Sequence, residues 1–379
     1  RQLPWIIAFV VILFQVYRLL PLAFTHRGRR ILRGKWRRVT SWELWPPYLT
    51  YLPLIPWLVW LAIRHRSPLA FTASNPAMPM GGLVGESKAA ILEGLGADQP
   101  EVPAFRLLLA ADAPETRAQA AEAFLDLEGI DLPVILKPNE GQRGSGVALV
   151  KTREDLRERA HQLNHDGLLQ ERIHGEEFGV FYVREPGHET GRIFSVTTKE
   201  LPEVVGDGAR TVEELLLEDP RASALHKSYL KELGTRADEV PLVGERVRLV
   251  EVGTHSRGAI FRDGSRLITP ELTEAVERLS SRYEGFHFGR YDVRTASAEA
   301  FSRGEGLRVI ELNGVTSEAT RIYDPDLSAL EAYRVLFRQW ELAYAIGAAN
   351  RAKGAPVATI RGALAEWFRY LRKQRSHRT

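Results

Sequence analysis

A series of short apolar segments, separated mostly by connections of hairpin length, restricts the fold of this chain more than any other feature. Segments of this kind predict strands, at Pro133–Lys137, Val147–Lys151, Leu168–Ile173, Phe178–Arg184, Arg192–Lys199, Arg246–Val252, Tyr291–Thr295 and Leu307–Leu312. Helical patterns lie among them, at Glu86–Leu95, Ala118–Leu127, Thr152–Leu163, Val212–Leu217, Pro270–Tyr283, Leu327–Ala348 and Ile360–Lys373. Parallel strands need long crossover connections, so the hairpin-length connections predict an α+β fold rather than a doubly wound sheet.

The composition is that of a globular protein, with 44% hydrophobic and 26% charged residues among 379. A net charge of +3 is modest, and we expect no nucleic-acid partner from it. The chain has no cysteine, which excludes a disulfide framework and thiolate metal sites and fits a reducing compartment.

A lysine beside a glycine-rich loop is the first candidate for chemistry. Lys137 ends a predicted strand, and Gly141, Gly144 and Gly146 follow it, with Arg143 as a second cation. Glycines let backbone N–H groups approach a phosphate closely, which favours a polyphosphate ligand. The loop matches neither a Walker A nor a Rossmann pattern, so an ordinary glycine-rich hairpin is the alternative.

Three oxygen-bearing side chains far downstream complement this loop. Glu311 and Asn313 alternate on one face of an apolar strand, and Asp292 lies in another strand. An acid among apolar neighbours is costly unless it is paired or bound to a metal. Oxygen ligands of this kind suit magnesium carried on a nucleotide. Surface-facing acids are the alternative, more so for Asp292 than for Glu311.

The order and spacing of several segments resemble the ATP-grasp superfamily, and within it carboxylate–amine ligases such as D-alanine–D-alanine ligase and cyanophycin synthetase. The similar segments are Glu86–Ile91, Val134–Pro138 with its loop, Gln170–Glu177, Gly289–Asp292 and Glu311–Gly314, and Val204–Leu215 looks like the cyanophycin synthetase branch. The resemblance covers about 85–324. It implies two α+β subdomains that clasp ATP.

This resemblance, together with the pattern of the first 66 residues described below, divides the chain into four segments. These are a membrane anchor at 1–66, a shortened N-terminal subdomain at 67–130, an ATP-grasp domain at 131–345 and a basic helical tail at 346–379. Only about 70 residues separate Arg66 from Lys137, too few for the Rossmann-like domain that family ligases usually carry. Substrate recognition is therefore the property least transferable from the family.

The resemblance also implies roles for individual residues. Lys88 and Lys137 would contact ATP phosphates, and the 141–146 loop, with Arg143, Gly144, Ser145 and Gly146, would cover them. Gln170, Glu171 and Ile173 would line the adenine edge, Glu177 would bind the ribose, and Asp292, Glu311 and Asn313 would hold two Mg²⁺ ions. Arg290 would act with Lys137 in catalysis by steadying the carboxylate and the tetrahedral intermediate; Lys199, His255 and Arg257 fall where the family closes over phosphate and substrate.

The first 66 residues differ from the rest. Leu3–Tyr17 is almost wholly apolar and the pattern continues to Phe24, a stretch that as a helix would reach roughly 33 Å, enough to cross a bilayer core. A basic loop without acids, Thr25–Thr40, comes next, and a proline-rich apolar stretch, Trp45–Ile63, follows. One alternative is a pair of buried core helices, which would not need the basic segment. The other is a secretory signal in the first stretch, but no small-residue cleavage site follows it and a second apolar segment does. We therefore predict membrane attachment, with the basic segment against an anionic leaflet.

Charge and chemistry together limit the topology. The positive-inside rule places the basic segment in the cytoplasm, and ATP chemistry places the C-terminal region there as well. Both hold only if one apolar stretch fails to cross, and the proline-rich stretch is the better candidate for a re-entrant or interfacial segment. We predict one crossing at most, at the cell membrane, with the large domain on the cytoplasmic face.

The predicted reaction is ATP-dependent amide formation through an acyl phosphate, with release of ADP and phosphate. The rival interpretations are phosphoryl transfer without ligation on the same fold, and a membrane-bound nucleotide-binding module without catalysis. The carboxylate and amine substrates are small-molecule or lipid-linked, and their identity and any self-association stay open.

Overall fold

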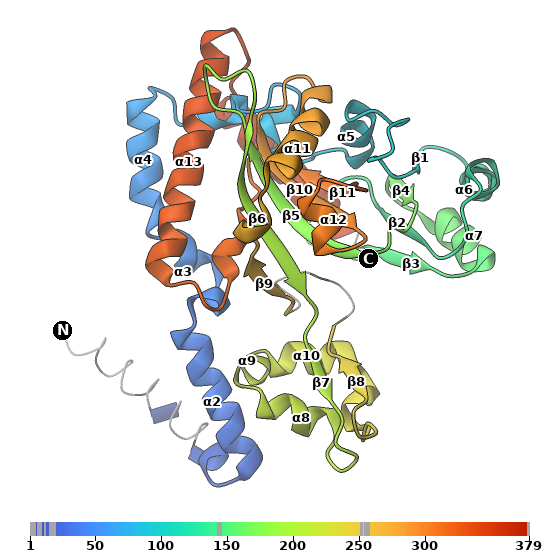
Figure 1. Ribbon diagram of the computed structural model, residues 1–379, viewed down its shortest axis with the longest axis vertical. Coiled ribbons are helices and arrows are strands. Elements are labelled where there is room, and N and C mark those ends of the chain that lie inside the picture. Colours follow the sequence, from blue (N-terminus) through green and yellow to red (C-terminus); the bar gives the residue numbers. More distant parts are fainter. Residues whose placement is uncertain are drawn as a thin grey trace. The chain divides into compact units, whose positions relative to one another are not determined.

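The computed structural model describes all 379 residues except 1–4, 6–9, 11–12, 15–19, 142–145, 251–252, 254–257 and 377–379. The chain forms two compact units (Figure 1). The smaller unit combines Arg1–Leu52, Glu200–Phe261 and Tyr323–Ala329, and the larger combines Pro53–Lys199, Arg262–Ile322 and Leu330–Thr379. Their limits differ from the four predicted segments, whose boundaries stay a prediction.

A four-stranded antiparallel sheet lies in the larger unit, in the order β1-β4-β2-β3. Its strands are β1 (Phe105–Leu108), β2 (Val134–Pro138), β3 (Ala148–Val150) and β4 (Gly167–Gln170). Helices α6 (Pro114–Glu128) and α7 (Arg153–Gln162) pack together, and their apolar side chains share one core with the sheet. The buried Arg117 of α6 donates hydrogen bonds to five backbone carbonyls, which fixes the loops around both helices.

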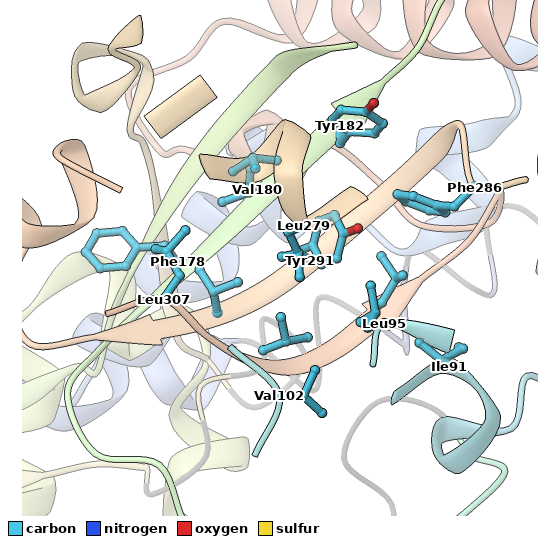
Figure 2. Packing of buried hydrophobic residues seen from close by; sticks show 14 of the residues in the cluster. Ile91, Leu95, Val102, Phe178, Val180, Tyr182, Leu279, Phe286, Tyr291 and Leu307 are labelled. Carbon is cyan, nitrogen blue, oxygen red and sulfur yellow. The ribbon is translucent and has the colours of Figure 1, made fainter. Parts of the chain in front are cut away.

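A five-stranded sheet has the order β11-β10-β5-β6-β9, with β10 paired antiparallel to both β5 and β11. Its strands are β5 (Glu176–Val183), β6 (Arg192–Glu200), β9 (Ile260–Asp263), β10 (Phe288–Thr295) and β11 (Arg308–Asn313). Figure 2 shows Phe178, Val180 and Tyr182, which alternate along β5, in one cluster with Tyr291 of β10. Helix α11 (Pro270–Arg282) covers this apolar face with Leu272, Val276 and Leu279. The short α12 (Ala298–Ser302) and α5 (Lys88–Gly94) complete the cluster with Phe301, Ile91 and Leu92.

The smaller unit contains α2 (His26–Thr40), α3 (Pro47–Tyr51), α8 (Val212–Glu218), α9 (Pro220–Ala224), α10 (His226–Leu233) and the hairpin of β7 (Glu203–Val205) with β8 (Arg246–Arg248). The predicted basic loop Thr25–Thr40 is in fact helix α2, whose N-terminus Thr25 caps by accepting a hydrogen bond from the Gly28 N–H. Arg27 and Arg30 form ion pairs of 2.5 Å with Glu213 and Glu218. The prediction of a loop was wrong. The acids that pair with these arginines lie in α8, remote in sequence, so the basic segment by itself did not show that it packs as a helix.

The apolar stretch Trp45–Ile63 is divided between α3 and α4 (Leu54–Arg64). Within the larger unit, α4 packs beside α13 (Ala329–Ala352), where the Trp57 indole donates a hydrogen bond of 3.1 Å to the Phe337 carbonyl (Figure 1). Among the described residues, no helix combines the length and the apolar character that a membrane crossing requires. Leu3–Tyr17 lies largely outside the described residues, so the predicted crossing there stays a prediction.

Candidate nucleotide site

Two lysines from different elements approach the same acid. Lys137, on β2, is buried and its Nζ donates a hydrogen bond of 3.2 Å to the Ile310 carbonyl of β11. Lys88 is the first residue of α5, which Ser87 caps, and its Nζ lies 3.7 Å from Glu311 Oε1. The Lys88 ammonium also donates to the Gly141 carbonyl at 2.8 Å, which ties it to the glycine loop. The two predicted phosphate-binding lysines therefore lie together beside Glu311.

The environment of Lys137 changes its protonation. Burial lowers the pKa of the Lys137 ammonium, the charge of Glu311 opposes this, and Lys88 adds to it, so that the pKa is about 8. At neutral pH the side chain is therefore largely charged but holds its proton less tightly than an ordinary lysine.

The register of β10 and β11 brings the predicted metal ligands together. Asp292 is paired directly with Glu311, and Arg290 with Asn313. Directly opposed residues of an antiparallel pair have neighbouring side chains, and residues two apart share a face. Arg290, Asp292, Glu311 and Asn313 therefore occupy one face of the sheet, where the sequence predicted a single site.

Cations surround Asp292. Its Oδ1 lies 3.1 Å from Lys199 Nζ and 3.4 Å from Arg290 Nε. Burial acts to raise the pKa of Asp292, but Arg290 and Lys199 outweigh it and lower the pKa to about 2. The carboxylate is therefore ionised throughout the physiological range, as a metal ligand must be.

Asp292, Glu311 and Asn313 fit a hard cation by their chemistry. The Nδ2 of Asn313 is buried and makes no hydrogen bond within the described part of the chain. The oxygen and nitrogen of an amide exchange places on a flip, so this group can present an oxygen to a cation instead. The described residues hold no group of three or more His, Cys, Asp or Glu suited to a metal, so the set here is two carboxylates and one amide.

Lys199 and Glu177 lie beside this set, and each is part of an ion-pair network. Lys199 Nζ is 2.6 Å from Glu177 Oε1, and Arg294 is 2.8 Å from Glu177 Oε2. Burial alone would lower the pKa of Lys199, but Asp292 and Glu177 outweigh it, so the pKa is raised. Glu177, which the sequence assigned to a ribose, is held here by two cations.

The predicted adenine-binding residues lie where the chain leaves one sheet of the larger unit and enters the other. Gln170 is the last residue of β4, Glu171 and Ile173 follow it, and β5 begins at Glu176. Gln170 is buried, and its Nε2 has no hydrogen-bond partner among the described residues. Glu171 accepts from Arg308 at 2.6 Å, and the Ile173 carbonyl accepts from Arg294 at 2.7 Å. The segment therefore carries an unsatisfied amide at the point where one sheet passes into the other.

The loop residues are described only in part. Gly146 has a φ of 74°, and a Cβ there would lie 2.7 Å from the Pro138 ring, so this turn requires glycine. Arg143, Gly144, Ser145, His255 and Arg257 lie outside the described residues, and their predicted roles stay predictions.

Glu86 begins the segment Glu86–Ile91, and the sequence alone predicts no role for it. Its Oε1 accepts a hydrogen bond of 2.8 Å from the Gly314 N–H, directly after β11. Burial raises the pKa of Glu86 to about 8, the charge of Glu311 adds to the rise, and the bond from Gly314 opposes it. The glycines Gly82 and Gly314 are the trace that this packing leaves in the sequence. A Cβ on either residue would collide with the Glu86 carboxyl.

Two adjoining pockets open at this site. A small one, with about 10 Å³ of room, is lined by Glu86, Lys88, Glu311 and Asn313 together with Tyr370. A larger cavity of about 620 Å³ is bounded by the 79–85 segment, Glu140 and helix α14 (Ile360–Ser376). Gly85 and Tyr370 line both pockets, so the large cavity adjoins the charged site directly.

Comparison with known proteins gives likenesses of low sequence identity. No family model matches the chain, and no curated protein matches it. A bifunctional glutathione synthetase from Pasteurella multocida is 17% identical, over 67% of this chain and 35% of that one, with a TM-score of 0.40. D-alanine–D-alanine ligase from Bacillus anthracis in complex with ATP is 15% identical, over 71% and 68%, also at 0.40. The VanG D-Ala:D-Ser ligase from Enterococcus faecalis is 14% identical, over 67% and 61%, at 0.37.

Likenesses at these TM-scores do not establish a shared fold or activity. The chain also spans about a third of the length of the glutathione synthetase. The functional case therefore depends on the geometry of the site itself.

Proposed function

We propose that this protein is an ATP-grasp carboxylate–amine ligase, which forms an amide through an acyl phosphate. One observation carries the proposal: Lys137 of one sheet and Lys88 of α5 approach Glu311, and the strand register sets Glu311 against Asp292 on the other sheet. Two cations beside a pair of carboxylates are suited to a nucleotide polyphosphate with its metal. The pieces come from separate elements, which fits a nucleotide clasped between two sheets.

Mg²⁺ would be held by Asp292, Glu311 and Asn313. When bound, it neutralises charge on the phosphate oxygens and orients them. Lys88 and Lys137 would supply further positive charge to the phosphate oxygens, as point charges. Gln170, with its unsatisfied amide, supplies polar contacts for an adenine edge.

In the proposed reaction, a substrate carboxylate oxygen attacks the γ-phosphorus of ATP. The bond to the β–γ bridging oxygen breaks, and ADP leaves with that electron pair. An amine then attacks the acyl carbon, and phosphate leaves as the amide forms. Arg290 is positioned beside Asp292, where its guanidinium can stabilise the oxyanion.

Glu86 is proposed to bind the amine substrate and to take up its proton. Its carboxyl lies beside Lys88 and Glu311, and a pKa of about 8 matches a group that exchanges protons near neutrality. In its ionised form it accepts a hydrogen bond from an ammonium and takes a proton as the nucleophile forms. The cavity of about 620 Å³, which carries Glu140, Glu366 and Arg369 on its wall, is proposed to receive the substrates.

A hydroxylamine trap tests the proposal directly. The protein is incubated with ATP, Mg²⁺, hydroxylamine and pools of carboxylic acids, and hydroxamate, ADP and phosphate are measured together. Glu311→Gln should abolish all three products, whereas Glu299→Gln, at an exposed position on α12, should retain them. ATP turnover without hydroxamate for any acid would contradict ligation, and a stable phosphorylated product would favour simple phosphoryl transfer.

We also propose that the protein acts at the cytoplasmic face of the cell membrane, on small-molecule or lipid-linked substrates. The apolar sequence up to Phe24 supports this, as does α4, where Ile55, Val59 and Ile63 form an exposed ridge at helical spacing. Separation of membranes from cytosol, followed by carbonate extraction, tests the placement. Recovery of the full-length chain in the cytosol alone would contradict it.

A further inference from the structure

Helix α14 has two chemically different faces. At 100° per residue, Ile360, Leu364, Trp367 and Leu371 fall within about 60° of one another, and Phe368 lies at the edge of this stripe. We call these five residues the α14 stripe. Their exposed fractions are 59, 52, 48, 38 and 57% in the order just given. The stripe is therefore a continuous apolar surface that the described chain does not cover.

The opposite face of α14 lines the large cavity. Gly362, Glu366 and Tyr370 lie there, at i, i+4 and i+8, and each is half-buried. The helix start is held in place, because the Ala358 N–H donates a hydrogen bond of 3.0 Å to Thr72 Oγ1. Because the small and polar face is turned to the protein, the apolar stripe has no role in the core of the larger unit.

We propose that α14 is an interfacial helix that lies on an anionic lipid bilayer, with the stripe inserted among the acyl chains. The sequence of the helix contains Arg361, Arg369, Arg372, Lys373 and Arg375 but only one acid, Glu366. That acid is on the cavity face and pairs with Arg369. Arg361 and Arg372 are exposed at about 100° and 120° on the same scale, next to Phe368 at the border of the stripe.

Trp, Phe and Leu on one face with basic residues beside them are typical of a helix lying in a membrane surface. The excess of positive charge selects lipids of negative charge. It also disfavours a second copy of the chain as the occupant, since two apposed stripes would bring like charges together. This surface does not depend on the chemistry proposed above or on the N-terminal residues.

The absence of cysteine from the sequence makes a site-specific probe available. Leu364→Cys, labelled with an environment-sensitive fluorophore, reports on the stripe alone, whatever other segments bind. We expect a blue shift in emission with vesicles of phosphatidylcholine and phosphatidylserine, and little shift with phosphatidylcholine alone. Glu299→Cys, labelled in the same way on the exposed surface of α12, serves as the control and should not respond.

The charge dependence completes the test. Arg361→Glu with Arg372→Glu, introduced into the Leu364→Cys chain, should weaken the vesicle-induced shift at least about tenfold in lipid concentration. Co-sedimentation with an unshifted Leu364→Cys label would overturn the proposal, because another segment would then bind the membrane. A label whose emission is already blue-shifted without vesicles would also overturn the proposal. If that shift depends on protein concentration, a second copy of the chain covers the stripe. If it does not, the chain's own apolar N-terminus covers it.

Discussion

At the scale of single residues, burial brings a base and an acid beside Glu311 to nearly the same pKa. It lowers the pKa of Lys137 and raises that of Glu86, both to about 8. The two groups respond to one cause in opposite directions, because burial disfavours whichever form carries charge. Near neutrality Lys137 is therefore largely charged and Glu86 largely neutral, and each can change state at little cost.

Nucleotide affinity should fall as pH rises above 8. Phosphates favour the charged lysine, so above pH 8 the free protein must take up a proton at Lys137 when it binds ADP. We expect the dissociation constant for ADP with Mg²⁺, measured by calorimetry, to rise roughly tenfold between pH 7.5 and 9.5. Lys137→Arg, which keeps its charge, should flatten this dependence, and Lys151→Met at an exposed position should not. A flat profile in the unmodified chain would contradict the assignment of Lys137 to phosphate.

Glu86→Gln should become relatively more stabilising as pH rises. The folded pKa of Glu86 is raised, so between about pH 4.5 and 8 the folded chain holds a proton that the unfolded chain has lost, and stability falls with pH. The Glu86→Gln variant lacks this titrating group. Its free energy of unfolding, measured by urea denaturation, should therefore rise relative to that of the unmodified chain between pH 5 and 8. Glu299→Gln should show no such trend over this range. A constant difference for Glu86→Gln would mean that its pKa is unperturbed.

At the scale of elements, the sequence predicted the elements that carry the site. Strands β2, β5, β6, β10 and β11 lie where apolar runs indicate them, because each buries at least one face in the larger unit. Strands β1, β7 and β9, of three or four residues each, were not predicted, whereas the equally short β3, β4 and β8 coincide with longer predicted strands.

The sequence also predicted part of the site. Lys137, Asp292, Glu311 and Asn313 could be proposed because polar residues stand out on apolar strands, and their roles stay predictions. The carboxyl of Glu86 was not found as a site residue, since its burial depends on Gly82 and Gly314 packing around it. The pairing of Lys199 and Arg294 with Glu177 joins β5, β6 and β10, and a register of this kind is not visible in local sequence.

Helix α2 shows what local sequence omits. Gly34 is in mid-helix, where alanine would normally be favoured by about 1 kcal/mol. A Cβ there would lie 2.4 Å from the Ser223 carbonyl of α9, within the smaller unit, so close approach of the two helices requires glycine.

Gly34→Val should therefore destabilise the smaller unit by a few kcal/mol, and Arg38→Ala, on the exposed face of the same helix, by well under that. Limited proteolysis with mass spectrometry should show earlier cleavage within 26–52 and 200–250 in Gly34→Val than in Arg38→Ala. Equal cleavage of the two variants would mean that α2 and α9 are not packed as described.

At the scale of the whole molecule, the proposed site exists only while separate elements are together. Lys88 comes from α5, Lys137 from the four-stranded sheet, and Glu311 with Asp292 from the five-stranded sheet. The connection between the sheets, 171–175, is short and carries Glu171 and Ile173, whose hydrogen bonds reach β11 and β10. A nucleotide that binds all these elements selects the arrangement in which they meet, so binding and folding stability are linked.

MgADP should therefore raise the melting temperature and protect the 171–175 connection from protease. At a hundredfold excess over its dissociation constant, a ligand specific to the folded state adds about 2.7 kcal/mol of stability. Glu311→Gln combined with Asn313→Ala should lose most of the shift measured with Mg²⁺ but retain the smaller shift that ADP gives without metal, because the lysines remain. If the double variant responds to MgADP as the unmodified chain does, the metal is held elsewhere. If neither chain responds to any nucleotide, the two sheets do not form a nucleotide site, and the ligase proposal fails with it.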